Sequence, residues 1–114
     1  MKTKDLVVNK RTTKFYELRF TKNGSPVDIT GWTILFTLKE KMSDSDNDAK
    51  IKKNITSHED PSGGISLVEL SVEDTDLLPK NYYYDVRYID DEENTDILYQ
   101  GKISIKEVTT QRVS

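Results

Sequence analysis

The sequence of 114 residues contains no cysteine and a single histidine, His58. Without cysteine there can be no disulfide, no thiolate nucleophile and no cysteine-ligated zinc, and one histidine excludes a histidine-rich metal site. Alanine, the strongest helix former, occurs once, whereas valine, isoleucine and threonine together supply 29 residues. This scarcity of helix formers and abundance of β-branched side chains predict an all-β protein.

Long apolar runs are missing as well. Residues 1–10 are mostly charged or polar, and their apolar run at 6–8 is too short for a signal peptide or a membrane span. We therefore expect no membrane association and a cytoplasmic location where the protein is made. The formal net charge of −3 is uneven, because residues 1–22 carry seven Lys or Arg and two acids. These basic residues lie in strand-like segments without interleaved aromatic side chains, so we expect no nucleic-acid binding.

Apolar and polar side chains alternate along most of the chain, as in strands with one buried face. The alternation is clearest at residues 32–39 and 82–89 and returns at 97–106. About seven strands, with turn signals roughly every 8–12 residues, predict one immunoglobulin-like antiparallel β-sandwich domain over residues 1–114. The side chains predicted for its core are Trp32, Ile34, Phe36, Leu38, Tyr84, Val86, Ile103 and Ile105.

Local signals refine this expectation along the first part of the chain. Asn23 and Gly24 favour the positive φ angles of a tight turn. The lysine-rich segment 50–56 has the composition of an edge strand protected from further pairing. Apolar residues occur in both phases over 65–72, so this strand either carries a β-bulge or is covered on both faces, and we favour the bulge.

The segment that follows combines a helical signal with a strand entry. Ser71 is a good N-cap, and Pro79 is a stop, so we expect one short helical turn near residues 72–78. The entry into the next strand resembles a tyrosine corner, whose hydroxyl comes from either Tyr82 or Tyr84.

Two clusters contain residue types that occur in metal or catalytic sites. Asp44, Asp46 and Asp48 have the spacing of the start of a calcium loop, but the glycine and glutamate that complete such a loop are absent. They are therefore a weak metal candidate in a loop kept soluble by charge. His58 and its acidic neighbours Glu59 and Asp60 lie on one polar turn, whereas a catalytic triad needs partners from separate elements. We expect no enzyme activity and no cofactor.

Candidate contacts with a partner lie at residue 83 and at residues 90–93. Tyr83 lies on the outward face of its predicted strand, and tyrosine is enriched at recognition surfaces. The hairpin tip carries four consecutive acids, which suit a basic protein partner. An alternative is a carbohydrate-binding or adhesion module that uses exposed tyrosines. The acids of the tip are Asp90, Asp91, Glu92 and Glu93.

Several segments together have the order of a known domain. They are Asn-Gly-Ser-Pro-Val-Asp-Ile-Thr-Gly-Trp at 23–32 with the strand to 39, the strand at 64–70, Asp-Thr-Asp-Leu-Leu-Pro at 74–79, Tyr-Tyr-Tyr-Asp-Val at 82–86 and Leu-Tyr-Gln-Gly-Lys-Ile-Ser-Ile at 98–105. These segments resemble the N-terminal immunoglobulin-like domain of phage baseplate upper proteins, over about residues 12–108. The chain departs from the family at Asn81, where glycine is usual.

The resemblance implies a non-enzymatic structural protein of a phage or prophage tail, found in the virion baseplate and in the host cytoplasm during assembly. Its implied partners are other tail proteins, with homo-oligomeric rings as the usual arrangement of such parts. The sequence also lacks the long C-terminal extension that carries receptor-binding parts in the family, so we expect a standalone docking module.

Overall fold

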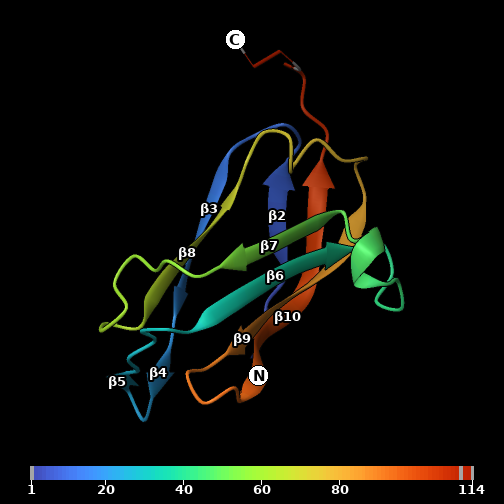
Figure 1. The fold of residues 1–114 in the computed structure, drawn as a ribbon. Coiled ribbons are helices and arrows are strands. Elements are labelled where there is room, and N and C mark those ends of the chain that lie inside the picture. The colour runs from blue at the N-terminus through green and yellow to red at the C-terminus, as the bar shows by residue number, and fades with distance from the viewer. Residues whose placement is uncertain (1, 111, 114) are drawn as a thin grey trace.

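The alternating segments form strands in the computed structural model, which describes residues 2–110 and 112–113 (Figure 1). The strands are β1 (Lys2–Thr3), β2 (Leu6–Asn9), β3 (Lys14–Arg19), β4 (Thr21–Lys22), β5 (Ser25–Pro26), β6 (Thr33–Lys39), β7 (Ile51–Ile55), β8 (Ile65–Leu70), β9 (Asn81–Ile89) and β10 (Thr95–Lys106). Among the described residues the one helix is a 3₁₀ turn, η1 (Asp46–Asp48). The all-β prediction is confirmed.

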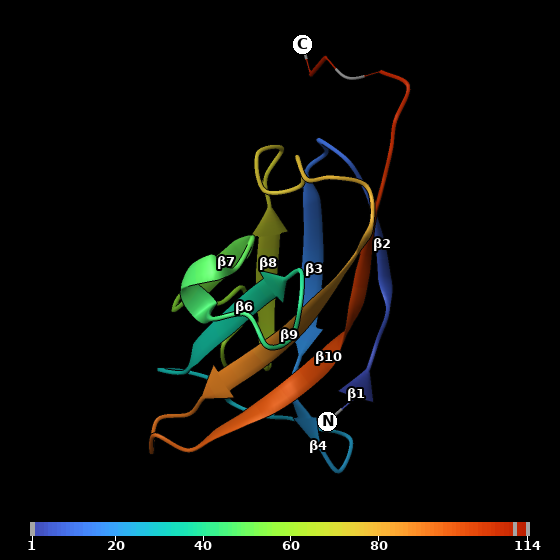
Figure 2. The same cartoon turned by 90° about the vertical axis from the view of Figure 1, so that its right-hand side faces the viewer.

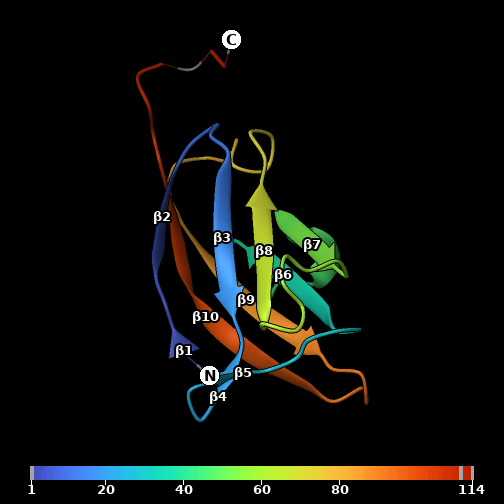
Figure 3. The ribbon, with the colours of Figure 1, turned by 90° about the vertical axis from the view of Figure 1, so that its left-hand side faces the viewer.

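The strands form two facing layers. The larger sheet has the order β1-β10-β9-β6-β7, and β2 continues the pairing along β10. The smaller layer is the antiparallel pair β3-β8, and the hairpin β4-β5 follows it. The large sheet lies in front in Figure 2, whereas β3 and β8 lie in front in Figure 3. The strands β10-β9-β6-β7 correspond to strands G-F-C-C′ of an immunoglobulin-like sandwich, and β3 and β8 correspond to its strands B and E.

The core lies between the layers because the strands alternate. On β6, Ile34, Phe36 and Leu38 are each at most 1% exposed, while the residues between them face outward. Burying a side chain of this size fully contributes roughly 1.5–3 kcal/mol. Seven of the eight residues predicted for the core are buried, namely Ile34, Phe36, Leu38, Tyr84, Val86, Ile103 and Ile105.

Trp32 is the exception, because it precedes β6 and is half-buried at one end of the sandwich. Its ring stacks on Tyr88 at a centroid distance of 5.1 Å and meets the edge of Phe20 at 5.5 Å. The three rings close the end of the sandwich, so Trp32 covers the core instead of lying within it.

The N-terminal edge corrects the prediction of a purely antiparallel sandwich. Both β1 and β2 run parallel to β10, with Lys2 opposite Tyr99 and Val8 opposite Ile105. Val8 is 2% exposed and completes the core along this edge. The apolar run at 6–8 is too short to predict a strand alone, and the open edge of β10 provides its pairing partner.

The short helical turn predicted near residues 72–78 is present as one hydrogen-bonded turn, in which the Thr75 amide donates to the Ser71 carbonyl at 3.1 Å. Ser71 does cap it, since its hydroxyl accepts from the Asp74 amide at 3.1 Å, and the Asp74 carboxylate accepts from the Ser71 amide at 2.9 Å. Buried Thr75 ties this turn to the N-terminal part of the chain. Its hydroxyl accepts from the Thr12 amide at 2.8 Å and donates to the Thr12 carbonyl at 2.7 Å.

The predicted bulge at 65–72 is wrong, because β8 pairs with β3 in unbroken register. Ser66, Val68 and Leu70 are buried toward the core, and Ile65 and Leu67, in the other phase, are half-buried. The register shift of the large sheet lies instead in β10, between Ile97 and Tyr99.

Three local predictions are confirmed. Asn23 and Gly24 have φ angles of 53° and 80° in the β4-β5 turn. The lysine-rich strand β7 lies at the end of the strand order, beside β6, and so forms a sheet edge. The tyrosine corner belongs to Tyr82, whose hydroxyl donates to the Leu78 carbonyl at 2.7 Å.

Candidate functional site

The outward side chains of the large sheet form two rows across its strands. Thr37 on β6, Asp85 on β9 and Gln100 on β10 lie in register, and Thr3 on β1 extends this row. The next row consists of Lys39, Tyr83 and Lys102 on the same three strands. These residues alternate with the core residues along their strands. Because successive side chains of a strand point to opposite faces of the sheet, they lie on the face away from the core.

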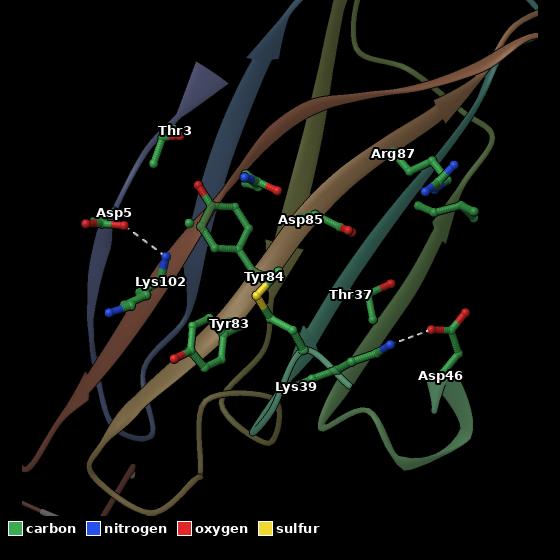
Figure 4. Close-up of a pocket in the computed structure, with 14 residues that line it drawn as sticks. Thr3, Asp5, Thr37, Lys39, Asp46, Tyr83, Tyr84, Asp85, Arg87 and Lys102 are labelled. Atoms are coloured by element: carbon green, nitrogen blue, oxygen red, sulfur yellow. Dashed lines mark hydrogen bonds and ion pairs between the residues drawn. The ribbon is translucent and has the colours of Figure 1, made fainter. Parts of the chain in front are cut away.

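The rows form the floor of a groove with a volume of about 510 Å³ (Figure 4). One wall is the N-terminal segment with Thr3 and Asp5, and the other is the loop with Met42 and Asp46. Figure 4 shows Tyr83, Asp85 and Arg87 along β9, with Thr37 and Lys39 on the neighbouring β6. We call this feature the outer groove.

Ion pairs and polar contacts fix both walls of the outer groove. The Lys39 ammonium lies 2.8 Å from the Asp46 carboxylate and donates to the Asp44 carbonyl at 2.8 Å. This partner lowers the pKa of Asp46. On the opposite wall, the Asp5 carboxylate accepts from the Lys102 amide at 2.9 Å, and the Lys102 ammonium lies 5.7 Å from the Tyr83 ring centroid.

Asp85 provides the half-buried carboxylate on the floor of the outer groove. Its side chain is half-buried, and no hydrogen bond to its carboxylate occurs among the residues that the structure describes. Burial raises the pKa of Asp85, although the nearby Arg87 and Lys39 oppose this effect. A carboxylate in this position has two oxygens ready to accept hydrogen bonds from a bound molecule.

The calcium-like aspartates do not converge. Asp46 pairs with Lys39, whereas Asp44 accepts from the Lys41 amide at 3.2 Å and Asp48 accepts from the Ser45 hydroxyl at 3.2 Å. Within the described ranges no group of three or more His, Cys, Asp or Glu side chains is placed to hold a metal ion. In the structure, this loop forms one wall of the outer groove.

The acidic tip lies apart from the outer groove, at the β9-β10 turn. Asp90 shapes the turn, since its carboxylate accepts from the amides of Glu92 at 2.9 Å and Asn94 at 2.8 Å. The side chains of Asp91, Glu92 and Glu93 are exposed. Of the predicted contact residues, only Tyr83 therefore lies in the outer groove.

His58 has a structural position between the two layers. Its Nδ1 lies 2.9 Å from the buried Ser66 hydroxyl, and its Nε2 lies 2.8 Å from the Trp32 carbonyl. Both ring nitrogens are thus engaged by core groups.

None of the described segments forms a helix that is long and apolar enough to span a membrane.

The sequence prediction of contacts missed Asp85, Gln100 and Thr37. The available signal was their alternation phase, which places all three on the outward face. What joins them is the pairing register of β6, β9 and β10, which connects residues far apart in the chain.

The geometry defines an immunoglobulin-like β-sandwich with a polar groove on its large sheet. No protein-family model and no curated protein matches the chain. Among solved structures, it is similar to the N-terminal domain of phage TP901-1 ORF48, with a TM-score of 0.51 and 10% sequence identity. The similarity covers 93% of this chain and 99% of that chain. The protein therefore shares the fold of a phage protein domain.

Proposed function

We propose that the protein is a non-enzymatic structural component of a phage or prophage tail, located in the baseplate, where it docks other tail proteins. The observation that carries this proposal is the likeness to the N-terminal domain of phage TP901-1 ORF48, which spans 93% of this chain. The ordered segments that resemble baseplate upper proteins support the same role. A fold by itself does not imply a function, so the proposal rests on the structural likeness and the ordered segments together.

The surface supports docking through electrostatic complementarity. The exposed acids Asp91, Glu92 and Glu93 project at the turn between the two longest strands, where they are free to meet a basic partner. The sole histidine is held between Ser66 and Trp32, and we assign no residue a catalytic role. Partners of this kind are other tail proteins, and several copies would sit in a symmetric ring.

Particle purification tests the proposal directly. For this test, a small C-terminal tag is added to the chain in the phage or lysogen that encodes it. Particles are then separated from unassembled protein on a density gradient. We expect the tag in tail-containing fractions and, by immunogold labelling, at the end of the tail that meets the host. A chain that remains wholly in the unassembled fraction, or labels the capsid, contradicts the proposal.

A further inference from the structure

The outer groove contains the components of a small-molecule site that the docking role does not use. Its volume of about 510 Å³ lies within the roughly 300–1,000 Å³ of ligand pockets. An aromatic ring, a carboxylate, an amide and hydroxyls from three strands and the N-terminal segment line a common space. We propose that the outer groove binds a neutral saccharide unit, with Tyr83 as the apolar platform and Asp85 as the central hydrogen-bond acceptor.

The charge of the lining favours a neutral ligand. Asp5, Asp46 and Asp85 are balanced by Lys39, Arg87 and Lys102. The Asp85 carboxylate at the floor would repel a phosphate or a carboxylate ligand. The three basic side chains around it would repel a cationic ligand. A polyhydroxy ligand has neither penalty and can both donate and accept hydrogen bonds.

Asp85 gives the groove its specificity for hydroxyl donors. The fold has already removed part of the water around this carboxylate without providing a donor from the described residues, and burial raises its pKa accordingly. Two neighbouring sugar hydroxyls can donate to its two oxygens. Gln100 and Thr37, in register on either side, offer further donors and acceptors at the same depth.

Tyr83 provides the apolar contact that sugars need on their C–H face. It lies in the row beside Asp85, and Lys102 covers part of the ring at 5.7 Å from the centroid. That contact holds the ring in place on the floor of the groove. Because the groove is open on one side, we expect weak binding, with a dissociation constant on the order of 1 mM.

The test uses the full-length, isotope-labelled protein and nuclear magnetic resonance titration. The probes are the methyl glycosides of glucose, galactose, rhamnose and N-acetylglucosamine, with glucosamine and glucuronate as charged counterparts. At least one neutral probe should shift the amide signals of Tyr83, Asp85 and Gln100. No shift with any neutral probe, or tighter binding of a charged sugar than of its neutral counterpart, overturns the assignment.

Matched variants locate the site. Tyr83→Ala and Asp85→Asn should each weaken binding at least tenfold, whereas Phe15→Ala, which removes an exposed ring on the smaller sheet, should leave it unchanged. Equal loss in all three variants, or unchanged binding in the first two, overturns the proposal. Asp85→Asn should fold normally, because it removes a half-buried charge. Normal incorporation of Tyr83→Ala into particles would show that docking and sugar binding are separate functions.

Discussion

Two tyrosine hydroxyls on β9 tie the sandwich to segments outside its central strands. Tyr82 donates to the Leu78 carbonyl at 2.7 Å, and Tyr84 donates to the Lys4 carbonyl at 2.6 Å. Both rings are buried on the core face. Burial is the main reason that the pKa of Tyr84 rises to about 12. At the residue scale, this hydroxyl connects the core to the N-terminal strands.

Tyr84 should therefore make stability sensitive to alkaline pH. The unfolded chain releases the phenol proton near pH 10, whereas the folded chain retains it to about pH 12. Stability from this group is complete below pH 10 and falls as the pH rises between these values. Urea unfolding across this range should show a steeper decline for the wild type than for Tyr84→Phe.

Tyr84→Phe should also cost about 1 kcal/mol at pH 7, because the Lys4 carbonyl loses its donor. All other side chains are the same in both proteins, so the difference between the two curves isolates the phenol. Parallel curves over the whole range would contradict this role for Tyr84.

At the scale of elements, β10 organises the N-terminal edge of the large sheet. It pairs with β9 on one side and with β1 and β2 on the other. Between β1 and β2, the Lys4 amide donates to the Gln100 carbonyl at 2.8 Å, and Asp5 accepts from the Lys102 amide at 2.9 Å. Gly101 lies at this point, where a side chain would collide with the Lys4 carbonyl.

Gly101→Ala should consequently loosen both N-terminal strands. The added methyl group meets backbone, which cannot rotate away, so we expect a loss of about 1–3 kcal/mol in the free energy of unfolding. Hydrogen exchange should become faster at the amides that bond β1 and β2 to β10. Lys106→Ala, an exposed change on the same strand, is the control. Unchanged exchange at the N-terminal edge in Gly101→Ala would contradict the argument.

At the scale of the whole molecule, the acidic tip and the segment after β10 lie at opposite ends of an elongated body of 43 × 33 × 23 Å (Figure 1). The outer groove lies on a sheet face between them. Docking through the tip would therefore leave the groove accessible. This separation allows a structural role and a ligand site in one small domain.

Charge reversal at the tip should reduce assembly if the tip meets a basic partner. In Asp91→Lys/Glu92→Lys, we expect incorporation into particles to fall on the order of tenfold, because like charges at an interface cost several kcal/mol. The control Glu59→Lys/Glu69→Lys makes the same change in net charge at other exposed sites. Asp90 is left intact because it shapes the turn. An equal loss in both variants would indicate a general charge effect.

Most of the strands, and the face on which most side chains lie, follow from local sequence patterns. Period-two alternation is a local property, so it identified the buried residues of β6 and the outward phase of Tyr83 and Asp85 without any partner strand. The Asn23-Gly24 turn and the cap at Ser71 were predictable for the same reason, since each depends on a few neighbouring residues.

Strand pairing, register and the outer groove depend on contacts between residues that are distant in the chain. The Thr75 hydroxyl donates to the Thr12 carbonyl, 63 residues away in the chain, and β3 holds β8 in unbroken register. The parallel pairing of β2 required the free edge of β10. The outer groove arose only when three strands brought Thr37, Asp85 and Gln100 into one row, because register is set by contacts between strands and not by the pattern within one.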